Sequence, residues 1–396
     1  MPSPIRILVV ADAVFPDDYG GSARVSWELS KSLSEAGHRV TILTIGKHRE
    51  RKKNRDDETY EGRVIRLINL KNITRIFRLS GVDLVIISSP LSGFIYYLFC
   101  RKKESSIVYL FHSPWAEEYK IRSRDIKRFL PFVGYISRKY IEHFLLSRAS
   151  KIVVLSRFMK EKVIELHKIK QDKIYIVPAG VDLKKFRPAE NSPRKILGLP
   201  EDKLILLTVR NLVSRMGIEN LILAMRSIKR KNKNIYLIIG GEGYLKEKLK
   251  NLTKNLELDN YVKFVDRIPD GHLPLYYQSA DLFILPTREL EGFGLVILES
   301  LACGTPVLAT PVGAIPEILE KFDKNFILRG AEPEDISDGV NKIVKILAKG
   351  GFKNKNLKGR CRRFVEENYS WEKFAHSIIK FYEAEKEEDS SYNNSA

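Results

Sequence analysis

The segment from Asp281 to Thr310 constrains the fold more than any other, because it has the pattern of one strand–helix–strand unit. Asp281–Leu285 is apolar after its first residue, which is typical of a buried parallel strand. Gly294–Cys303 is apolar on nearly every side and is followed by Gly304, a residue favoured just after a helix. Thr305–Thr310 is a second apolar run at the spacing of a βαβ unit. The chain is therefore predicted to be an α/β protein with parallel strands.

The loop between this strand and this helix has the composition of a ligand site. It contains Glu291, Gly292, Phe293 and Gly294, and it lies at the carboxyl edge of the strand, where open α/β sheets bind ligands. Backbone N–H groups at the start of a helix suit an anion, and the two glycines let a ligand approach the main chain closely. We therefore expect an anionic ligand at this loop.

Glu299 is the only charged residue within the apolar helix. A buried carboxylate is costly without a partner, so something must satisfy it. Two interpretations are open: an ion pair with a neighbouring arginine or lysine, or hydrogen bonds to a pair of ligand hydroxyls. The second interpretation is motivated by the direction of helical side chains, which lean toward the helix N-terminus and hence toward the loop.

The two glutamates resemble a known signature. Glu291 and Glu299, within EGFGLVILESLACGTPVLAT, are similar to the E-x7-E motif of the family 4 retaining glycosyltransferases, and the flanking Pro286 and PVGAIPEIL extend the match. The resemblance implies the GT-B fold, in which two Rossmann-like domains face each other across a cleft. It also implies that Glu299 binds the ribose of a nucleotide-diphosphate sugar and that Glu291 holds hydroxyls of the donor sugar. The amides of Phe293–Leu295 would lie near the phosphate and the sugar.

Length and apolar runs predict the domain organisation. At 396 residues the chain suggests two domains. We expect an acceptor domain at residues 1–187, a linker at 188–193, a donor domain at 194–370, a helix at about 371–385 that returns to the first domain, and a polar, disordered tail at 386–396. The predicted strands are Ile5–Val10, Val40–Ile45, Val64–Ile68, Val82–Ser88, Ile107–Phe111, Lys151–Leu155, Ile174–Val177, Lys203–Val209, Asn234–Ile239 and Tyr261–Val265, and further helices are expected from Ser156 and over Gly93–Cys100 (a buried helix), Pro333–Leu347 and Leu357–Glu367.

Charge and cysteine content limit the partners and the compartment. Lys+Arg minus Asp+Glu is 68 − 49 = +19, which favours nucleotide phosphates, an acidic membrane surface or nucleic acid as partners. Three scattered cysteines show no metal-ligand spacing and fit a reducing, cytoplasmic interior, with Cys303 as a small core residue. The first residues have the pattern of a strand rather than a signal peptide, and no apolar run is long enough to span a bilayer.

A double glycine, Gly20-Gly21, follows the first predicted strand. Ser22 is expected to be the N-cap of a helix that ends near Gly37. Two adjacent glycines by themselves often mark only a tight turn. The pair is also similar to the family's GG-x-x-x-V loop, and that resemblance implies that Gly20 and Gly21 face the donor phosphates and the acceptor.

His112 directly follows a predicted strand, in the run FHSPWAEEY. A histidine at a strand end is often only a capped structural group, so the residue alone leaves its role open. The resemblance implies an active-site histidine near the donor sugar at this position. It also suggests that Trp115 and Glu117 touch the acceptor.

Arg210 ends the strand that opens the second domain, where an arginine suits bidentate contact with phosphate. An exposed loop arginine is the alternative. The segment resembles the family's G-R-x-x-x-x-K-G pattern, whose arginine and lysine clamp the donor diphosphate, but Met216 stands where lysine is usual. We predict that Arg215 supplies the missing charge. The residues assigned to the donor by residue type and resemblance are Gly20, Gly21, Arg210, Arg215, Arg267, Ile268, Phe293, Gly294, Leu295 and Glu299, with Arg267 and Ile268 along the nucleobase.

The segment Tyr119–Lys151 is rich in Lys and Arg interleaved with aromatic and aliphatic residues. It is predicted either to cover the first domain's sheet with a basic outer face or to lie on anionic lipid. The resemblance favours lipid contact, since many relatives act on lipid-linked acceptors.

Together with these observations, the resemblance implies a retaining, metal-independent glycosyltransferase with Glu291 and His112 at its catalytic centre. Its partners would be a nucleotide sugar and a saccharide or lipid-linked acceptor, with no cofactor and no nucleic acid, and it would be cytoplasmic or at the inner face of the membrane. A nucleotide-sugar epimerase of the same fold, or a basic membrane- or nucleic-acid-binding protein with an inactive site, remains as an alternative. A nicotinamide dehydrogenase is disfavoured, because no G-x-G-x-x-G follows the first strand.

Overall fold

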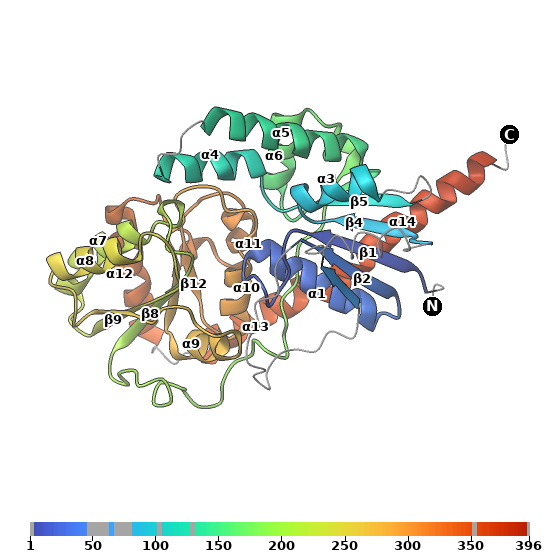
Figure 1. Cartoon of the computed structure of the whole chain (residues 1–396). Coiled ribbons are helices and arrows are strands. Elements are labelled where there is room, and N and C mark those ends of the chain that lie inside the picture. The colour runs from blue at the N-terminus through green and yellow to red at the C-terminus, as the bar shows by residue number, and fades with distance from the viewer. Residues whose placement is uncertain are drawn as a thin grey trace. The chain divides into compact units, whose positions relative to one another are not determined.

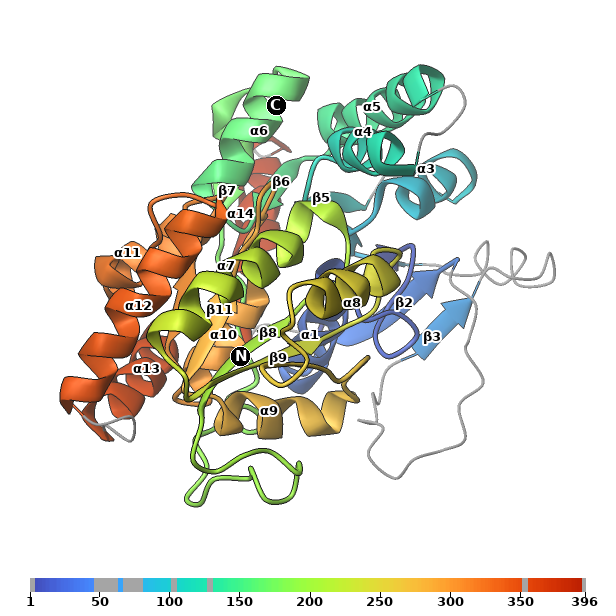
Figure 2. The ribbon, with the colours of Figure 1, turned by 90° about the vertical axis from the view of Figure 1, so that its left-hand side faces the viewer.

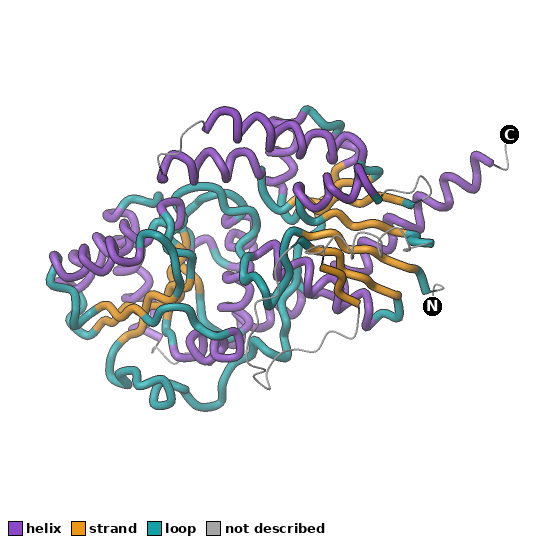
Figure 3. The backbone as a smooth tube through the Cα atoms, in the orientation of Figure 1, coloured by secondary structure: helices purple, strands orange, loops and turns teal. Residues whose placement is uncertain are grey.

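The computed structural model describes residues 4–45, 63–66, 81–100, 105–126, 131–350 and 355–393. The chain divides into two compact units, residues 1–180 with 371–396, and residues 181–370. In both units helices and strands alternate along the chain (Figure 3). The sequence placed 181–187 in the first domain, whereas the structure assigns them to the second. Part of the reason is that Arg362 of the second unit donates hydrogen bonds to the main-chain oxygens of Leu183 and Phe186.

The first unit contains a seven-stranded parallel sheet in the order β3-β2-β1-β4-β5-β6-β7. Its strands are β1 (Arg6–Ala11), β2 (Arg39–Thr44), β3 (Arg63–Arg66), β4 (Leu84–Ile87), β5 (Ser106–Phe111), β6 (Lys151–Val154) and β7 (Ile174–Ile176). The helices are α1 (Gly21–Glu35), α3 (Pro90–Phe99), α4 (Trp115–Ile126), α5 (Pro131–Arg148), α6 (Arg157–His167) and α14 (Trp371–Asn393). Helix α14 packs against α1, and α5 packs against both α3 and α4 (Figure 1).

The second unit contains a five-stranded parallel sheet in the order β10-β9-β8-β11-β12. Its strands are β8 (Leu204–Val209), β9 (Ile235–Gly240), β10 (Val262–Phe264), β11 (Leu282–Leu285) and β12 (Val307–Ala309). The helices are α7 (Ile218–Lys231), α8 (Lys246–Asn255), α9 (Leu273–Ser279), α10 (Leu295–Ala302), α11 (Ile315–Phe322), α12 (Pro333–Gly350) and α13 (Lys355–Asn368). Helix α7 packs against α12, and α10 packs against α9 and α13 (Figure 2).

The buried strands follow the apolar runs of the sequence closely. Each predicted strand is present within the described residues, apart from the end of Val64–Ile68, which lies outside them. The charged run HRERKKNRDD at 48–57, which the sequence predicts to be a solvated loop, also lies outside the described residues. The helix expected from Ser156 is also confirmed, since the Ser156 side chain accepts a hydrogen bond from the Met159 N–H as an N-cap. The apolar runs predicted the strands well because a strand with neighbours on both sides and helices on both faces is buried on every side and is therefore apolar throughout.

Three predictions about helix ends and exposure are wrong. The N-cap of α1 is Gly20 rather than Ser22, so the helix starts earlier than expected. Helix α3 is buried only on one side, because Leu98 and Phe99 are exposed. Helix α14 continues to Asn393, so most of the expected polar tail is helical. Charged residues such as Glu and Lys are good helix formers, which explains why a polar composition does not end the helix.

In each sheet the strand order reverses at one point: successive strands are first added on one side of the first strand, and later strands are added on its other side. The reversal lies between β1 and β4 in the first unit and between β8 and β11 in the second. Open parallel sheets bind ligands in the crevice at the carboxyl ends of the strands on either side of such a point. The fold therefore marks one candidate site in each unit.

Candidate functional site

In the second unit, Arg210 and Glu291 meet at the reversal point, one after β8 and the other after β11. Arg210 Nη2 lies 2.5 Å from Glu291 Oε2, and the two side chains are 9% and 10% exposed. Thr287 Oγ1 donates to the same carboxylate oxygen at 3.1 Å. Arg210 Nη2 also lies 2.8 Å from the sulfur of Met216, while Arg210 Nε is buried without a partner among the described residues. The pair is thus largely dehydrated, and the arginine retains unused donor capacity.

Two glycines pack against the main chain of Arg210 and Glu291. Gly241 has φ +135°, and a Cβ there would lie 1.8 Å from the main-chain oxygen of Arg210. Gly313 has φ +61°, and a Cβ there would lie 2.2 Å from the main-chain oxygen of Glu291. Both positions combine a positive φ with a close backbone approach, which only glycine accommodates. The main chain is therefore shaped to carry Arg210 and Glu291 at fixed positions.

Glu299 lies on α10 and is 9% exposed. Its carboxylate accepts a hydrogen bond from the Tyr277 hydroxyl on α9 at 2.9 Å. Burial and the neighbouring Glu299 raise the pKa of Tyr277 well above its usual value, while the Arg210 charge acts in the opposite direction. The Tyr277 hydroxyl is thus one partner of the Glu299 carboxylate. The arginine of this site pairs with Glu291.

Arg215 joins the two loops that carry the site. Its Nη1 donates to the main-chain oxygen of Leu290 at 2.8 Å, and its own main-chain oxygen accepts from the N–H of Arg288 at the same distance. The guanidinium therefore braces the loop of Glu291 from the loop of Arg210. The predicted role of Arg215 as a second diphosphate clamp stays a prediction.

The remaining donor candidates of the second unit lie along the same edge of the sheet. Gly294 is the N-cap of α10 and Leu295 its first residue, and Phe293 is buried against the ring of Tyr369. Arg267 and Ile268 follow β10, and the Ile268 side chain is buried next to Gly240 at the end of β9. The structure thus gathers the second-unit candidates at the carboxyl ends of β8, β9, β10 and β11.

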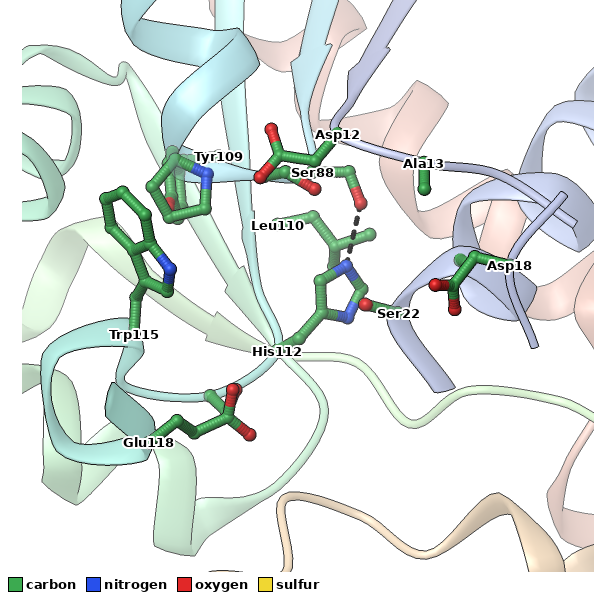
Figure 4. A pocket seen from close by; sticks show the side chains of 14 residues that line it. Asp12, Ala13, Asp18, Ser22, Ser88, Tyr109, Leu110, His112, Trp115 and Glu118 are labelled. Atoms are coloured by element: carbon green, nitrogen blue, oxygen red, sulfur yellow. Dashed lines mark hydrogen bonds between the residues drawn. The ribbon is translucent and has the colours of Figure 1, made fainter. Parts of the chain in front are cut away.

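The first unit contains a cavity of about 220 Å³ at its own reversal point. Residues that follow β1, β4 and β5 line it, and Figure 4 shows the side chains of Asp12, Ser88 and Trp115 around the imidazole of His112. The complete lining is Asp12, Ala13, Asp18, Ser22, Ala23, Ser88, Ser89, Pro90, Tyr109, Leu110, His112, Ser113, Trp115 and Glu118. The lining is acidic and hydroxyl-bearing, with an indole at one side, which suits a polyhydroxylated ligand.

His112 is held neutral in this cavity. Its Nε2 and the Ser88 Oγ are hydrogen-bonded at 2.7 Å, and Ser88 is bonded in turn to Ser26 Oγ at 2.6 Å. Burial lowers the pKa of His112 to about 4. At neutral pH the imidazole therefore carries no charge and presents one donor and one acceptor nitrogen.

Asp12 was not identified from the sequence as a candidate, although it directly follows β1. Its Oδ1 accepts a hydrogen bond from the Ser92 N–H in the first turn of α3 at 2.8 Å, and burial raises its pKa. The signal that could have identified it is a lone acid at the carboxyl end of a buried central strand. Thr287 and Tyr277 were missed for a different reason, because no local pattern marks them.

Of the other first-unit candidates, some lie at the cavity and some do not. The Gly20 N–H donates to Asp18 Oδ1 at 2.5 Å at the start of α1. Asp18 and Ser22, on either side of the double glycine in the sequence, line the cavity. Trp115 lines the cavity, but Glu118 rather than Glu117 accompanies it, and Glu117 accepts a hydrogen bond from Tyr135. The assignment of Glu117 to the acceptor is therefore not supported by its position.

A buried carboxylate fixes the helix that carries Trp115. Glu142 Oε1 accepts from the Trp115 N–H at 3.0 Å, and Oε2 lies 3.0 Å from His167 Nε2, with the Glu142 and His167 side chains each 1% exposed. Acidic groups are favourable at a helix N-terminus. This contact ties the first turn of α4, and with it one wall of the cavity, to α5 and α6.

Two parallel-sheet units, each with polar residues at its reversal point, are the architecture of the GT-B glycosyltransferases. A solved structure of this class, Anabaena Alr3699/HepE in complex with UDP-glucose, superposes with a TM-score of 0.75 at 16% identity, over 96% of this chain and 100% of that one. Family models match both halves: "Glycosyltransferase Family 4" over residues 19–185 and "Glycosyl transferases group 1" over residues 190–349. The chain belongs to glycosyltransferase family 4.

Two curated relatives agree with this assignment. The uncharacterised glycosyltransferase MJ1607 of Methanocaldococcus jannaschii is 28% identical over 247 residues, which are 61% of this chain and 62% of that protein. One of the chains of the phosphatidylinositol N-acetylglucosaminyltransferase of Arabidopsis thaliana is 22% identical over 94% of this chain and 80% of its own length. The match to MJ1607 thus spans about three fifths of that protein.

Proposed function

We propose that this chain transfers a sugar from a nucleotide-diphosphate sugar to a hydroxyl of a saccharide or lipid-linked acceptor, with retention of anomeric configuration and without a metal ion. The observation that carries the proposal is the pairing of Arg210 with Glu291 at the β8/β11 reversal point, with the buried Glu299 in the helix α10 that follows the Glu291 loop. Support for the ligands comes from the relatives, since HepE is described in complex with UDP-glucose and phosphatidylinositol stands in the name of the Arabidopsis protein.

In this proposal each residue of the second unit has one task. Arg210 and the N-terminal amides of α10 take the negative charge that develops on the departing diphosphate. Glu299 accepts hydrogen bonds from the ribose hydroxyls, and Glu291 accepts them from the sugar. Positive groups and oriented amides that are already in place stabilise the leaving group without reorganising at the moment of reaction.

The first unit would receive the acceptor in the cavity around His112. A neutral imidazole, the Asp12 carboxylate and the Trp115 indole offer hydrogen bonds and a flat apolar surface to a sugar or cyclitol ring. His112 would contact the reacting sugar as an uncharged hydrogen-bonding group.

A thermal-shift screen of uridine, guanosine and adenosine diphosphate sugars tests the proposal. We expect one base to raise the melting temperature by a few degrees, because a ligand at 100 times its Kd stabilises the folded state by about 2.7 kcal/mol. Glu299→Gln should remove most of that shift while it preserves an oxygen acceptor for Tyr277. Glu320→Gln, on the exposed side of α11, removes the same charge away from the site and should leave the shift intact.

The products distinguish the reaction from its alternatives. Incubation of the bound donor with a saccharide and lipid panel, followed by proton NMR of the product, should show an unchanged anomeric configuration, and EDTA should leave the rate unchanged. Conversion of the donor sugar to its epimer without any acceptor would identify an epimerase instead. Loss of activity in EDTA that Mg²⁺ restores would refute metal independence.

A further inference from the structure

Within the part of the chain that the structure describes, the Arg210 guanidinium makes its polar contacts through a single nitrogen. Nη2 reaches Glu291 Oε2 at 2.5 Å and the Met216 sulfur at 2.8 Å, whereas Nε is buried and has no partner. A guanidinium has five N–H donors in a fixed fork and is suited to bidentate bonds. The observed contacts leave most of that capacity unused, in a side chain that is 9% exposed. Such a group points to an anion that completes its hydrogen bonding.

The Arg210 guanidinium has two anionic partners in the proposed complex: the Glu291 carboxylate and the donor diphosphate. A diphosphate is the natural bidentate partner of an arginine, and Glu291 already occupies one edge of the group. Two anions cannot both take full advantage of one cation, because they also repel each other in a site with little water. A bidentate bond uses two neighbouring nitrogens, and each such pair of the guanidinium includes Nη2, so the diphosphate displaces part of the Nη2 contacts with Glu291 and Met216.

We propose that Glu291 and the donor diphosphate compete for Arg210, so that donor binding releases the Glu291 carboxylate for the hydroxyls of the sugar. This inference rests on the proposed function. Thr287 makes the exchange feasible, because its hydroxyl donates to the oxygen that Arg210 would leave. Met216 is the positioning residue: its buried, uncharged thioether holds Nη2 beside Glu291 without a charge of its own.

The competition has a consequence that a simple sugar-binding role for Glu291 does not have. Loss of the Glu291 charge should free Arg210, so a nucleotide diphosphate without a sugar should bind more tightly. The same change removes the acceptor for sugar hydroxyls, so the additional affinity that the sugar contributes should fall. The two ligands therefore respond in opposite directions to one substitution.

Titration calorimetry of Glu291→Gln with UDP, GDP and ADP, and with the corresponding nucleotide sugars, tests this prediction. We expect the affinity for the preferred nucleotide diphosphate to rise at least about fivefold, as for a modest coupling between two ligands. The ratio of nucleotide-sugar to nucleotide-diphosphate affinity should fall. Glu320→Gln is the matched control, since it removes one charge on the exposed side of α11, away from the Arg210 side chain, which contacts Glu291 and Met216. It should change neither affinity.

Met216→Leu is a second variant that preserves every charge and nearly the same volume, so it keeps the test open if Glu291→Gln does not fold. We expect a smaller rise in nucleotide-diphosphate affinity, about twofold, because one contact that holds Nη2 beside Glu291 is lost. Weaker or unchanged nucleotide-diphosphate binding in Glu291→Gln would overturn the competition and show that Glu291 orients Arg210 toward the phosphate or acts separately from it. If no nucleotide binds to the unaltered protein, the proposed function itself fails.

Discussion

A histidine side chain that is largely withdrawn from water is easier to keep neutral than charged, and His112 is in this position. Burial lowers its pKa to about 4, whereas the unfolded chain should have a value near 6.5. Between these two values the unfolded state binds more protons than the folded state. The stability that His112 provides is therefore complete above about pH 6.5 and is lost as the pH falls toward 4.

The predicted loss is measurable by urea unfolding at pH 7 and pH 4.5. The lowering of the His112 pKa corresponds to roughly 3 kcal/mol of unfolding free energy between about pH 6.5 and pH 4. His112→Gln should abolish that part of the pH dependence. Asp12 works in the opposite sense, because burial raises its pKa and the folded state gains protons as the pH falls. The comparison of the two proteins removes the Asp12 contribution. An identical drop in the His112→Gln variant would contradict the prediction.

At the scale of elements, one arginine ties the segment that leads into β8 to the loop that leads into β11. Arg194 donates to the main-chain oxygens of Glu201, Lys203 and Ser279 and lies 2.6 Å from Asp281 Oδ2. The same Asp281 oxygen accepts from the Ile205 N–H at 2.7 Å, at the start of β8. The two central strands of the second sheet are therefore connected at their N-terminal ends by one charged network.

We predict that Arg194→Ala lowers the unfolding free energy by about 3–5 kcal/mol, because it removes the positive charge beside the largely buried Asp281 carboxylate, which keeps the Ile205 N–H, and leaves three carbonyl oxygens without the guanidinium. Urea unfolding of the complete chain, observed by circular dichroism, gives the value. Arg194→Ala combined with Asp281→Asn should lose less than the sum of the single changes, since the uncompensated charge is gone. A loss below about 1 kcal/mol for the single change would show that the network contributes little.

The elements that sequence predicted well are those with a local signature. The run LFIL of β11 and the helix LVILESLA of α10 are apolar on nearly all sides, so their burial follows from composition alone. Helix starts were harder, as α1 shows: a serine with N-cap propensity stands inside the first turn of the helix, and a glycine occupies the cap. Side-chain caps are preferences of about 1 kcal/mol, which tertiary packing easily overrides.

The site was predicted in position but not in pairing. Arg210 and Glu291 were expected in the loops that follow strands and Glu299 in the helix that follows the Glu291 loop, and the structure has them there. Their partners, however, come from distant segments: Glu299 contacts a tyrosine 22 residues earlier, and Glu291 contacts an arginine 81 residues earlier. Pairings of this kind depend on strand order, which a single sequence does not state.

At the scale of the whole molecule, a strongly basic chain carries exposed apolar side chains on two helices that pack together. Phe132 and Tyr140 of α5 are 73% and 65% exposed, and Leu98 and Phe99 of α3 are 55% and 61% exposed. The adjacent α4 carries exposed Lys120 and Arg122. None of the described helices is long and apolar enough to cross a membrane. Aromatic side chains beside basic residues are typical of surfaces that lie on anionic lipid.

We predict that the chain binds vesicles of phosphatidylcholine mixed with anionic phosphatidylglycerol and that added salt weakens this binding, because basic residues near the lipid each contribute about 1 kcal/mol that ions screen. Replacement of Phe132 and Tyr140 by serine should lower the partition coefficient about tenfold, since two rings no longer leave water. Ile196→Ser is the control, because Ile196 is 77% exposed but lies in the other unit. Cosedimentation measures the bound fraction. Equal binding to pure phosphatidylcholine, or an equal loss in Ile196→Ser, would count against this surface as the lipid contact.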